Sequence, residues 1–397
     1  MNSILSRVLL ALLSTFAWTS YAHQEDSFNV LSSDQINLHL KHYRTEQPNN
    51  FNQDHVILYI QGQSDATSVA EHFLVDCLEN LNINVVSYDV RGQGASDGER
   101  AHVDDFYDHL DDLANILNFV QAKLNYKHVH FITHSTGGLI ATLFASVHRP
   151  MLSDQSSLIL VAPYFGLSGS SLSSFGIDLL TYFLSFTPAK LWRAPKAGGQ
   201  GLYTKSDGSM NNFSSDPQMF QNYKNHPDKC GRPTLGWVQA SLEAHRIIEE
   251  EAENLQHPIL MFTAAGDQVV STSEAKRFYE MWENTSAHNT YIEFAEPNQH
   301  GLIYEREETR SKMISAIGHF IDNVTKATPI TRHQLNPELI SSMQNKAVLA
   351  YKAEQNTTLM PKVKRKKSLN QLALYPAFFL FIPFATVLYL RRKRTSL

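Results

Sequence analysis

The sequence predicts an α/β fold in which a mostly parallel sheet carries helices on both faces. Short runs rich in apolar and β-branched residues alternate along the chain with longer stretches whose apolar residues recur at helical spacing. Such alternation is typical of parallel strands joined by helical crossovers. The length agrees, because 397 residues, 43% of them hydrophobic, can bury a large core.

Eight strands are expected. Residues 27–44, SFNVLSSDQINLHLKHYR, indicate an opening antiparallel hairpin. Apolar runs that end in turn residues predict six further strands, at 55–62, 82–92, 128–135, 156–165, 257–267 and 289–297. Apolar residues at helical spacing predict helices between them, among others over 103–124 and 138–147.

One interval breaks this alternation. Residues 166–255 separate two consecutive strands and hold an apolar run at 175–186, a glycine-rich stretch and a later helical segment. Because a structureless loop of that length is improbable, we expect an inserted cap subdomain, with a plain structural excursion as the alternative. The core would then consist of 23–165 and 256–325.

Both ends of the chain carry patterns typical of a membrane protein. Residues 1–22 combine an early positive charge, a mostly apolar stretch and a small-residue cleavage pattern, which predicts a signal peptide, with an uncleaved anchor as the alternative. Residues 371–390 carry no charge and are numerous enough to cross a bilayer. We expect a basic stalk over 326–370, a transmembrane helix over 371–390 and a basic tail over 391–397. The predicted localisation is therefore the membrane, with the folded body outside the cytoplasm, in the periplasm if the source is bacterial.

The charge distribution bears on possible partners. Nine of the 34 basic residues lie in clusters at 362–367 and 391–394, and the remaining 25 stand against 39 acidic residues. A body this acidic repels phosphate backbones, which excludes nucleic acid as its partner. No cysteine or histidine spacing predicts a metal site, and two cysteines, Cys77 and Cys230, are too few for a disulfide scaffold. Protein partners stay open.

Ser135 is the candidate nucleophile. It follows the strand HVHFI and precedes the helical segment GLIATLFASV, with Gly137 two residues beyond it. A strand, a tight turn and a helix form the setting in which a serine hydroxyl is lifted above a parallel sheet. Thr133 stands where the G-x-S-x-G pattern has glycine, so the motif alone is weak evidence.

A serine nucleophile needs a base and an orienting carboxylate. Asp267 ends the strand ILMFTAAGD, and His300 follows the strand YIEFAEP. Both lie at carboxyl ends of predicted strands, where sites are built on parallel sheets, and they occur in the order serine, aspartate, histidine. Singly, Asp267 is typical of a turn cap and His300 of a solvated histidine. Together the three residues predict a catalytic triad.

Five ordered segments carry a resemblance to a known family: QGQSDATSVAEHF, YDVRGQGASDGER, THSTGG, AAGDQVVS and NQHGLIYERE. The chain resembles the serine α/β-hydrolases of the lysophospholipase and monoacylglycerol lipase group, which are also grouped with the S33 serine peptidases. Residues 231–251 are similar to the cap of the bacterial lysophospholipase L2 branch in particular. The resemblance covers about 28–323 and implies an α/β-hydrolase fold.

The resemblance also implies roles for single residues. Ser135 would be the nucleophile, Asp267 the orienting acid and His300 the general base. The backbone N–H groups of Gln63 and Thr136 would form the oxyanion hole. Six apolar residues would line an acyl-binding cap, with cap core as the equal alternative: Leu179, Leu180, Tyr182, Phe183, Leu184 and Phe186.

Two further positions compare with the family pattern. Gln61 replaces the family's histidine before Gly62, which leaves the backbone donors of the loop in place. The RGxGxS segment that begins at Arg91 is interpreted as a structural turn.

The expected function is hydrolysis of carboxylic esters of single-chain lipids, a lysophospholipid or a monoacylglycerol, without cofactor or metal. Two alternatives stay open: an S33-type peptidase of the prolyl aminopeptidase kind, because fold does not choose between esters and amides, and a hydrolase-fold scaffold whose triad is idle.

Overall fold

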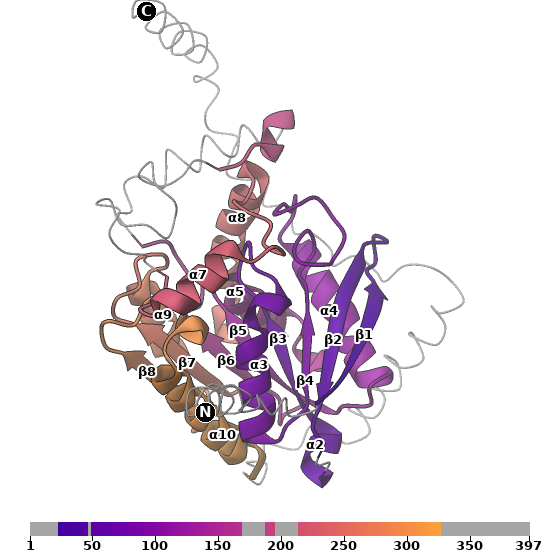
Figure 1. Cartoon of the computed structure of the whole chain (residues 1–397), viewed down its shortest axis with the longest axis vertical. Helices are drawn as coiled ribbons and strands as arrows, with labels where there is room; N and C mark the ends of the chain where they lie inside the picture. The colour runs from indigo at the N-terminus through magenta and orange to yellow at the C-terminus, as the bar shows by residue number, and fades with distance from the viewer. Residues whose placement is uncertain (1–22, 47–48, 169–186, 195–212, 327–397) are drawn as a thin grey trace, which may run out of the picture. The chain divides into compact units, whose positions relative to one another are not determined.

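One eight-stranded sheet organises the molecule (Figure 1). A computed structural model describes residues 23–46, 49–168, 187–194 and 213–326, all within one compact unit. The sheet order is β1-β2-β4-β3-β5-β6-β7-β8. The strands are β1 Gln24–Leu31, β2 Asn37–Arg44, β3 His55–Ile60, β4 Val85–Tyr88, β5 His128–His134, β6 Ser157–Val161, β7 Ile259–Ala264 and β8 Thr290–Phe294.

Strand directions confirm the predicted hairpin and the mostly parallel sheet. β1 pairs with β2, and β2 with β4, in antiparallel register. From β4 through β3, β5, β6 and β7 to β8 every pairing is parallel. The central strands β3, β5, β6 and β7 are buried almost throughout, which explains the apolar runs of β3, β6 and β7; β5 also buries His130, Thr133 and His134.

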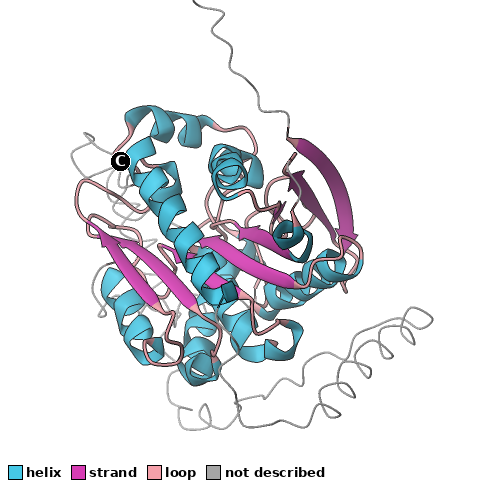
Figure 2. Cartoon of the chain, turned by 90° about the horizontal axis from the view of Figure 1, so that it is seen from below, coloured by secondary structure: helices cyan, strands magenta, loops and turns pink. Residues whose placement is uncertain are grey.

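Helices cover both faces of the sheet (Figure 2). On one face α4, α5, α8 and α9 pack around residues such as Phe131, Phe144 and Trp282. On the other face α3 and α10 pack around Tyr59 and Phe73. The helix bounds are α2 Asn50–Asp54, α3 Thr67–Leu81, α4 Tyr107–Ala122, α5 Thr136–Val147, α7 Pro217–Asn225, α8 Leu235–Glu251, α9 Thr272–Trp282 and α10 Glu307–Lys326.

Between β6 and β7 the described chain holds a short 3-10 helix, Pro188–Leu191, followed by α7 and α8. Asp216 and Thr234 cap the N-termini of α7 and α8 with their side-chain oxygens. The C-terminal half of α8 packs into the core through Ala244 and Ile248. This segment therefore reaches from the sheet's helix layer toward the edge that carries the candidate site.

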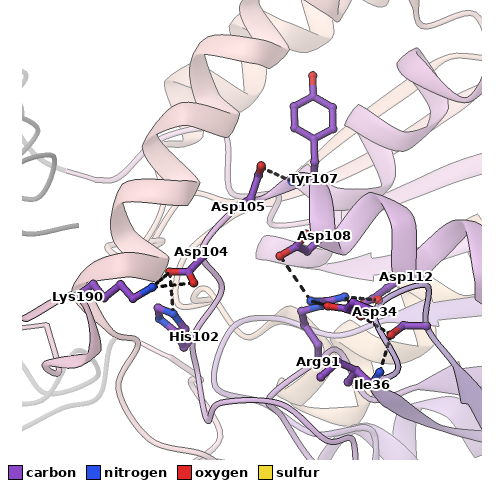
Figure 3. Close-up of polar contacts among 11 residues, drawn as sticks. Asp34, Ile36, Arg91, His102, Asp104, Asp105, Tyr107, Asp108, Asp112 and Lys190 are labelled. Carbon is purple, nitrogen blue, oxygen red and sulfur yellow. Dashed lines mark hydrogen bonds and ion pairs between the residues drawn. The ribbon is translucent and has the colours of Figure 1, made fainter. Parts of the chain in front are cut away.

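A buried ion pair holds Arg91 at the start of the turn that the sequence analysis interpreted as structural (Figure 3). The Arg91 guanidinium donates to both carboxylate oxygens of Asp112, at 2.6 and 2.7 Å, and also to Asp34. Arg91 and Asp112 have side chains only 9% and 1% exposed. This buried pair joins the loop after β4 to α4 and so fixes the turn from inside.

The predicted membrane segments require a correction. No helix in the described ranges is long and apolar enough to span a bilayer. The longest, α10, has the length but is amphipathic, since Met313 and Ile317 are buried while Glu308 and Lys312 form an exposed ion pair. The predicted localisation, a membrane protein with one C-terminal span and its body outside the cytoplasm, is contradicted by this finding and is withdrawn.

The segments on which that localisation depended are 1–22, 326–370, 371–390 and 391–397. Apart from Lys326, which ends α10, they lie outside the described residues. The two cysteines are both free, and Cys77 is buried in the core.

Candidate active site

Ser135 occupies a sharp turn between β5 and α5. Its backbone has φ 53° and ψ −116°, outside the regions that L residues ordinarily adopt. Such strain persists only where surrounding structure enforces it. Here Ser135 N donates to Val161 O on β6 at 3.0 Å, and Ser135 O accepts from Tyr164 N and Gly138 N. The turn thus presents the Ser135 hydroxyl at the carboxyl edge of the sheet.

The turn requires glycine at position 137 but accepts threonine at position 133, where the G-x-S-x-G pattern has its first glycine. A Cβ at Gly137 would lie 2.2 Å from Ile60 O, so only glycine fits there. At Thr133 the side chain finds room, because its Oγ1 donates to Ile159 O on the neighbouring strand at 3.2 Å. The threonine therefore packs into the sheet without disturbing the turn.

The structure brings Ser135, His300 and Asp267 together. His300 Nε2 lies 3.1 Å from Ser135 Oγ, and His300 Nδ1 lies 2.8 Å from Asp267 Oδ2. The side chains of His300 and Asp267 are 3% and 2% exposed. Residues from the ends of three strands thus form one hydrogen-bonded chain that can move a proton off a hydroxyl.

The environment of Asp267 keeps it ionised. Burial by itself would raise its pKa, but the positive charge that His300 carries when it is protonated, and the hydrogen bond from His300, oppose this and hold the pKa below its ordinary value. The other carboxylate oxygen, Oδ1, accepts from Val269 N and Val270 N at 2.8 and 3.0 Å. Asp267 is therefore fixed as an acceptor on both oxygens, and it orients His300 with Nδ1 protonated and Nε2 free to accept.

The loop after β3 runs beside Ser135. A Cβ at Gly62, the residue before Gln63, would lie 3.2 Å from Ser135 Cβ, so the backbone at Gly62 is close to this candidate nucleophile. Thr136 is the first residue of α5, where N–H groups have no partner within the helix. The Gln61 side chain, which replaces the family's histidine, donates to Asp65 O at 3.1 Å and so stabilises this loop.

Sequence reasoning missed a buried polar group behind the triad. His134, the residue before Ser135, donates through Nε2 to His300 O at 3.2 Å. Burial lowers the His134 pKa to about 3, so it is neutral. Beside it, Tyr304 donates to Asp65 at 2.7 Å, and burial raises the Asp65 pKa to about 6. Adjacency to Ser135 is the one signal that could have singled out His134.

Six predicted pocket residues lie outside the described residues: Leu179, Leu180, Tyr182, Phe183, Leu184 and Phe186. Their role stays a prediction.

Comparison of the sequence with protein families identifies the family to which the chain belongs. The sequence model described as "Serine aminopeptidase, S33" matches residues 52–307, from α2 to the first residue of α10. The chain belongs to this family. The match includes Ser135, Asp267 and His300, and it confirms the resemblance seen in the sequence. The chain is thus a serine hydrolase of the S33 family.

Two curated proteins to which the chain is similar are lipid hydrolases by name. The chain is 26% identical to lysophospholipase L2 of Escherichia coli K12 over 319 residues, which cover 77% of this chain and 89% of that protein. It is 24% identical to monoglyceride lipase of Rattus norvegicus over 253 residues, covering 63% and 77% of the two chains.

A solved structure shares the fold. A soluble variant of monoglyceride lipase from Saccharomyces cerevisiae, crystallised with a substrate analog, superimposes with a TM-score of 0.60 at 15% identity. The superposition covers 78% of this chain and 99% of that one. This likeness confirms the predicted α/β-hydrolase fold.

Proposed function

We propose that this S33-family enzyme hydrolyses the carboxylic ester of a single-chain lipid, a lysophospholipid or a monoacylglycerol, through an acyl-enzyme on Ser135. The observation that carries the proposal is the hydrogen-bonded chain from Ser135 Oγ through His300 to Asp267. The names of the relatives support a carboxylester hydrolase, and they support a lipid substrate over other esters.

Acylation begins when His300 Nε2 takes the proton of the Ser135 hydroxyl as its oxygen attacks the ester carbonyl carbon. The carbonyl oxygen then carries the negative charge, and the N–H groups of Gln63 and Thr136 stabilise it. When the intermediate collapses, the ester C–O bond breaks, and His300 gives its proton to the departing alcohol. Asp267 stabilises the imidazolium throughout.

Deacylation repeats these steps with water. His300 removes a proton from the water molecule, the resulting hydroxide attacks the acyl carbon, and the fatty acid leaves as Ser135 regains its proton. Apart from the ester and the water molecule, both steps use only side chains and backbone groups of this chain.

The domain organisation follows the same proposal. Residues 23–165 and 256–325 would form the catalytic core, and 166–255 a cap over its carboxyl edge. Leu179, Leu180, Tyr182, Phe183, Leu184 and Phe186 would line the acyl site in that cap. An apolar cap suits a substrate whose acyl chain must leave water before the ester reaches Ser135.

A comparison of three substrates tests the proposal. Purified protein is incubated with a lysophospholipid, a monoacylglycerol and an aminoacyl-proline amide, and the released fatty acid or amine is quantified. We expect fatty acid release from at least one lipid and no release in Ser135→Ala. Cleavage of the amide alone would establish the peptidase alternative, and no turnover of any substrate would favour a scaffold.

A further inference from the structure

The loop that carries His300 is held by a segment of the predicted cap. This cap seam, residues 213–216, lies beside the loop 299–305. Gly301 N donates to Phe213 O at 2.6 Å, and Ser214 Oγ donates to Tyr304 O at 2.7 Å. The Phe213 ring also lies 6.3 Å, centroid to centroid, from the His300 ring. The position of the loop therefore depends on the cap seam.

The Glu305 carboxylate bridges the cap seam and the loop 299–305. Glu305 is fully buried, at 0% exposure. Its Oε1 accepts at 2.8 Å from the backbone N–H of Gln299, the residue directly before His300. The same carboxylate accepts from Ser215 N at 2.9 and 3.0 Å and from Ser215 Oγ at 2.5 Å. One buried carboxylate thus binds both the cap seam and the residue next to the candidate base.

The peptide group after His300 and the N–H group of the residue before it are fixed in this way. Glu305 holds Gln299 N, His134 holds the carbonyl of His300, and Phe213 O holds Gly301 N. These contacts leave the imidazole at 3.1 Å from the Ser135 hydroxyl. Proton transfer depends steeply on this distance, since a misplacement of about 1 Å can cost about 10²-fold in rate.

We propose that Glu305 is a positioning residue that sets the geometry of His300 through Gln299, and that it links this geometry to the seating of the cap on the core. The inference rests on the proposed function, because it takes His300 as the base. Within the described residues the Glu305 carboxylate accepts hydrogen bonds from Gln299 and Ser215 and none from Ser135, so it acts through the loop. When the cap seam is displaced, the base loses the contacts that aim it at Ser135.

The first test replaces Glu305 with its amide. In Glu305→Gln one carboxylate oxygen becomes an NH₂ group, which cannot accept a hydrogen bond, while size and shape are kept. At the Oε2 position this removes the acceptor for Ser215 Oγ, and at the Oε1 position it removes the acceptor for Gln299 N. We expect kcat to fall about 10- to 100-fold with KM within about threefold of wild type. Glu308→Gln is the matched control, because Glu308 lies exposed on α10 and pairs with Lys312 at the surface. It should leave both parameters unchanged.

The second test disturbs the contact between the His300 loop and the cap seam at Gly301. Gly301 has φ −82°, so alanine is free to adopt its backbone conformation. A Cβ there would, however, lie 2.8 Å from both Phe213 O and the Phe213 ring, which pushes the seam and the loop apart. Gly301→Ala should lower kcat as Glu305→Gln does, again with KM preserved. This variant also serves if Glu305→Gln fails to fold.

A fluorophosphonate probe, which reacts with activated serines, separates the inference from the proposed function. The labelling rate of Ser135 is measured for wild type, Glu305→Gln, Gly301→Ala and Glu308→Gln on folded protein. A slower rate in the first two variants alone supports the inference. If wild type labels and all variants label equally fast, with only their Tm lowered, Glu305 is structural and the inference is overturned. If wild type does not label, the proposed function itself fails.

Discussion

Replacing Asp267 with asparagine should misdirect the proton of His300. Val269 N and Val270 N both donate to Asp267 Oδ1, so the carbonyl oxygen of an asparagine must stay at that position. Its NH₂ group then faces His300 Nδ1 at the place where Oδ2 lies 2.8 Å away. An amide nitrogen donates, so Nδ1 must accept and the imidazole proton moves to Nε2.

The cost of Asp267→Asn follows from that tautomer. With Nε2 protonated, His300 cannot take the proton of Ser135, although all three side chains keep their places. A wrong tautomer in a serine triad lowers kcat by about 10⁴-fold, which corresponds to about 5 kcal/mol of lost transition-state stabilisation. The Tm should change little, because the fold keeps its shape and the two backbone bonds.

The assay measures kcat/KM for ester hydrolysis by wild type and Asp267→Asn, with circular dichroism to establish that both are folded. Asp267→Glu is a useful companion, because it keeps the charge but displaces it. A loss of less than about tenfold in a folded Asp267→Asn protein would refute the assigned role of Asp267.

Three further predictions concern stability. Arg91→Met leaves the buried Asp112 carboxylate unpaired and should lower the free energy of unfolding by about 3–5 kcal/mol; a midpoint in urea equal to wild type would contradict the structural role of this pair. Gly137→Ala places a Cβ 2.2 Å from Ile60 O and should abolish fluorophosphonate labelling or prevent folding; a folded, normally labelled variant would disprove the close approach. Burial lowers the pKa of His130 to about 3, whereas the unfolded chain titrates near the ordinary value of about 6.5. As pH falls, the unfolded chain therefore protonates His130 before the folded protein does. The stability that neutral His130 contributes is fully present above about pH 6.5 and is lost as pH falls toward 3. A Tm that stays constant from pH 7 to 4 would contradict this prediction.

The sheet was predictable because each strand is a local pattern. The buried runs of β3, β6 and β7 are mostly apolar, β5 sets its apolar residues between histidines, and turn residues mark the ends of these strands. Their parallel direction followed from the helices between them. The candidate triad was also within reach of sequence reasoning, because Ser135, Asp267 and His300 each follow a strand and so share one edge.

The supports of the site were not predictable from the sequence. Glu305 and Ser215 lie ninety residues apart, and nothing local to either indicates that one carboxylate meets the other's N–H group. His134 has the same difficulty, since a histidine in a strand gives no sign of a carbonyl 166 residues away. Such contacts depend on how the cap seam and the loops meet, which is a property of tertiary packing rather than of local sequence.

The membrane prediction, which used only local sequence features, was wrong. A run of uncharged residues and its flanking charges are local features, and they predicted a span over 371–390. No helix in the described ranges has the length and apolar character of a span.

The most direct test of the account is the identity of the residue that carries the acyl group. Wild-type protein is mixed with an activated ester of a fatty acid, quenched with acid within the first turnover and digested for mass spectrometry. We predict that the acyl mass appears on the peptide containing Ser135 and is absent from Ser135→Ala. Acylation of another residue, or an equal yield of acylated protein in the alanine variant, would contradict the central claim that Ser135 is the nucleophile.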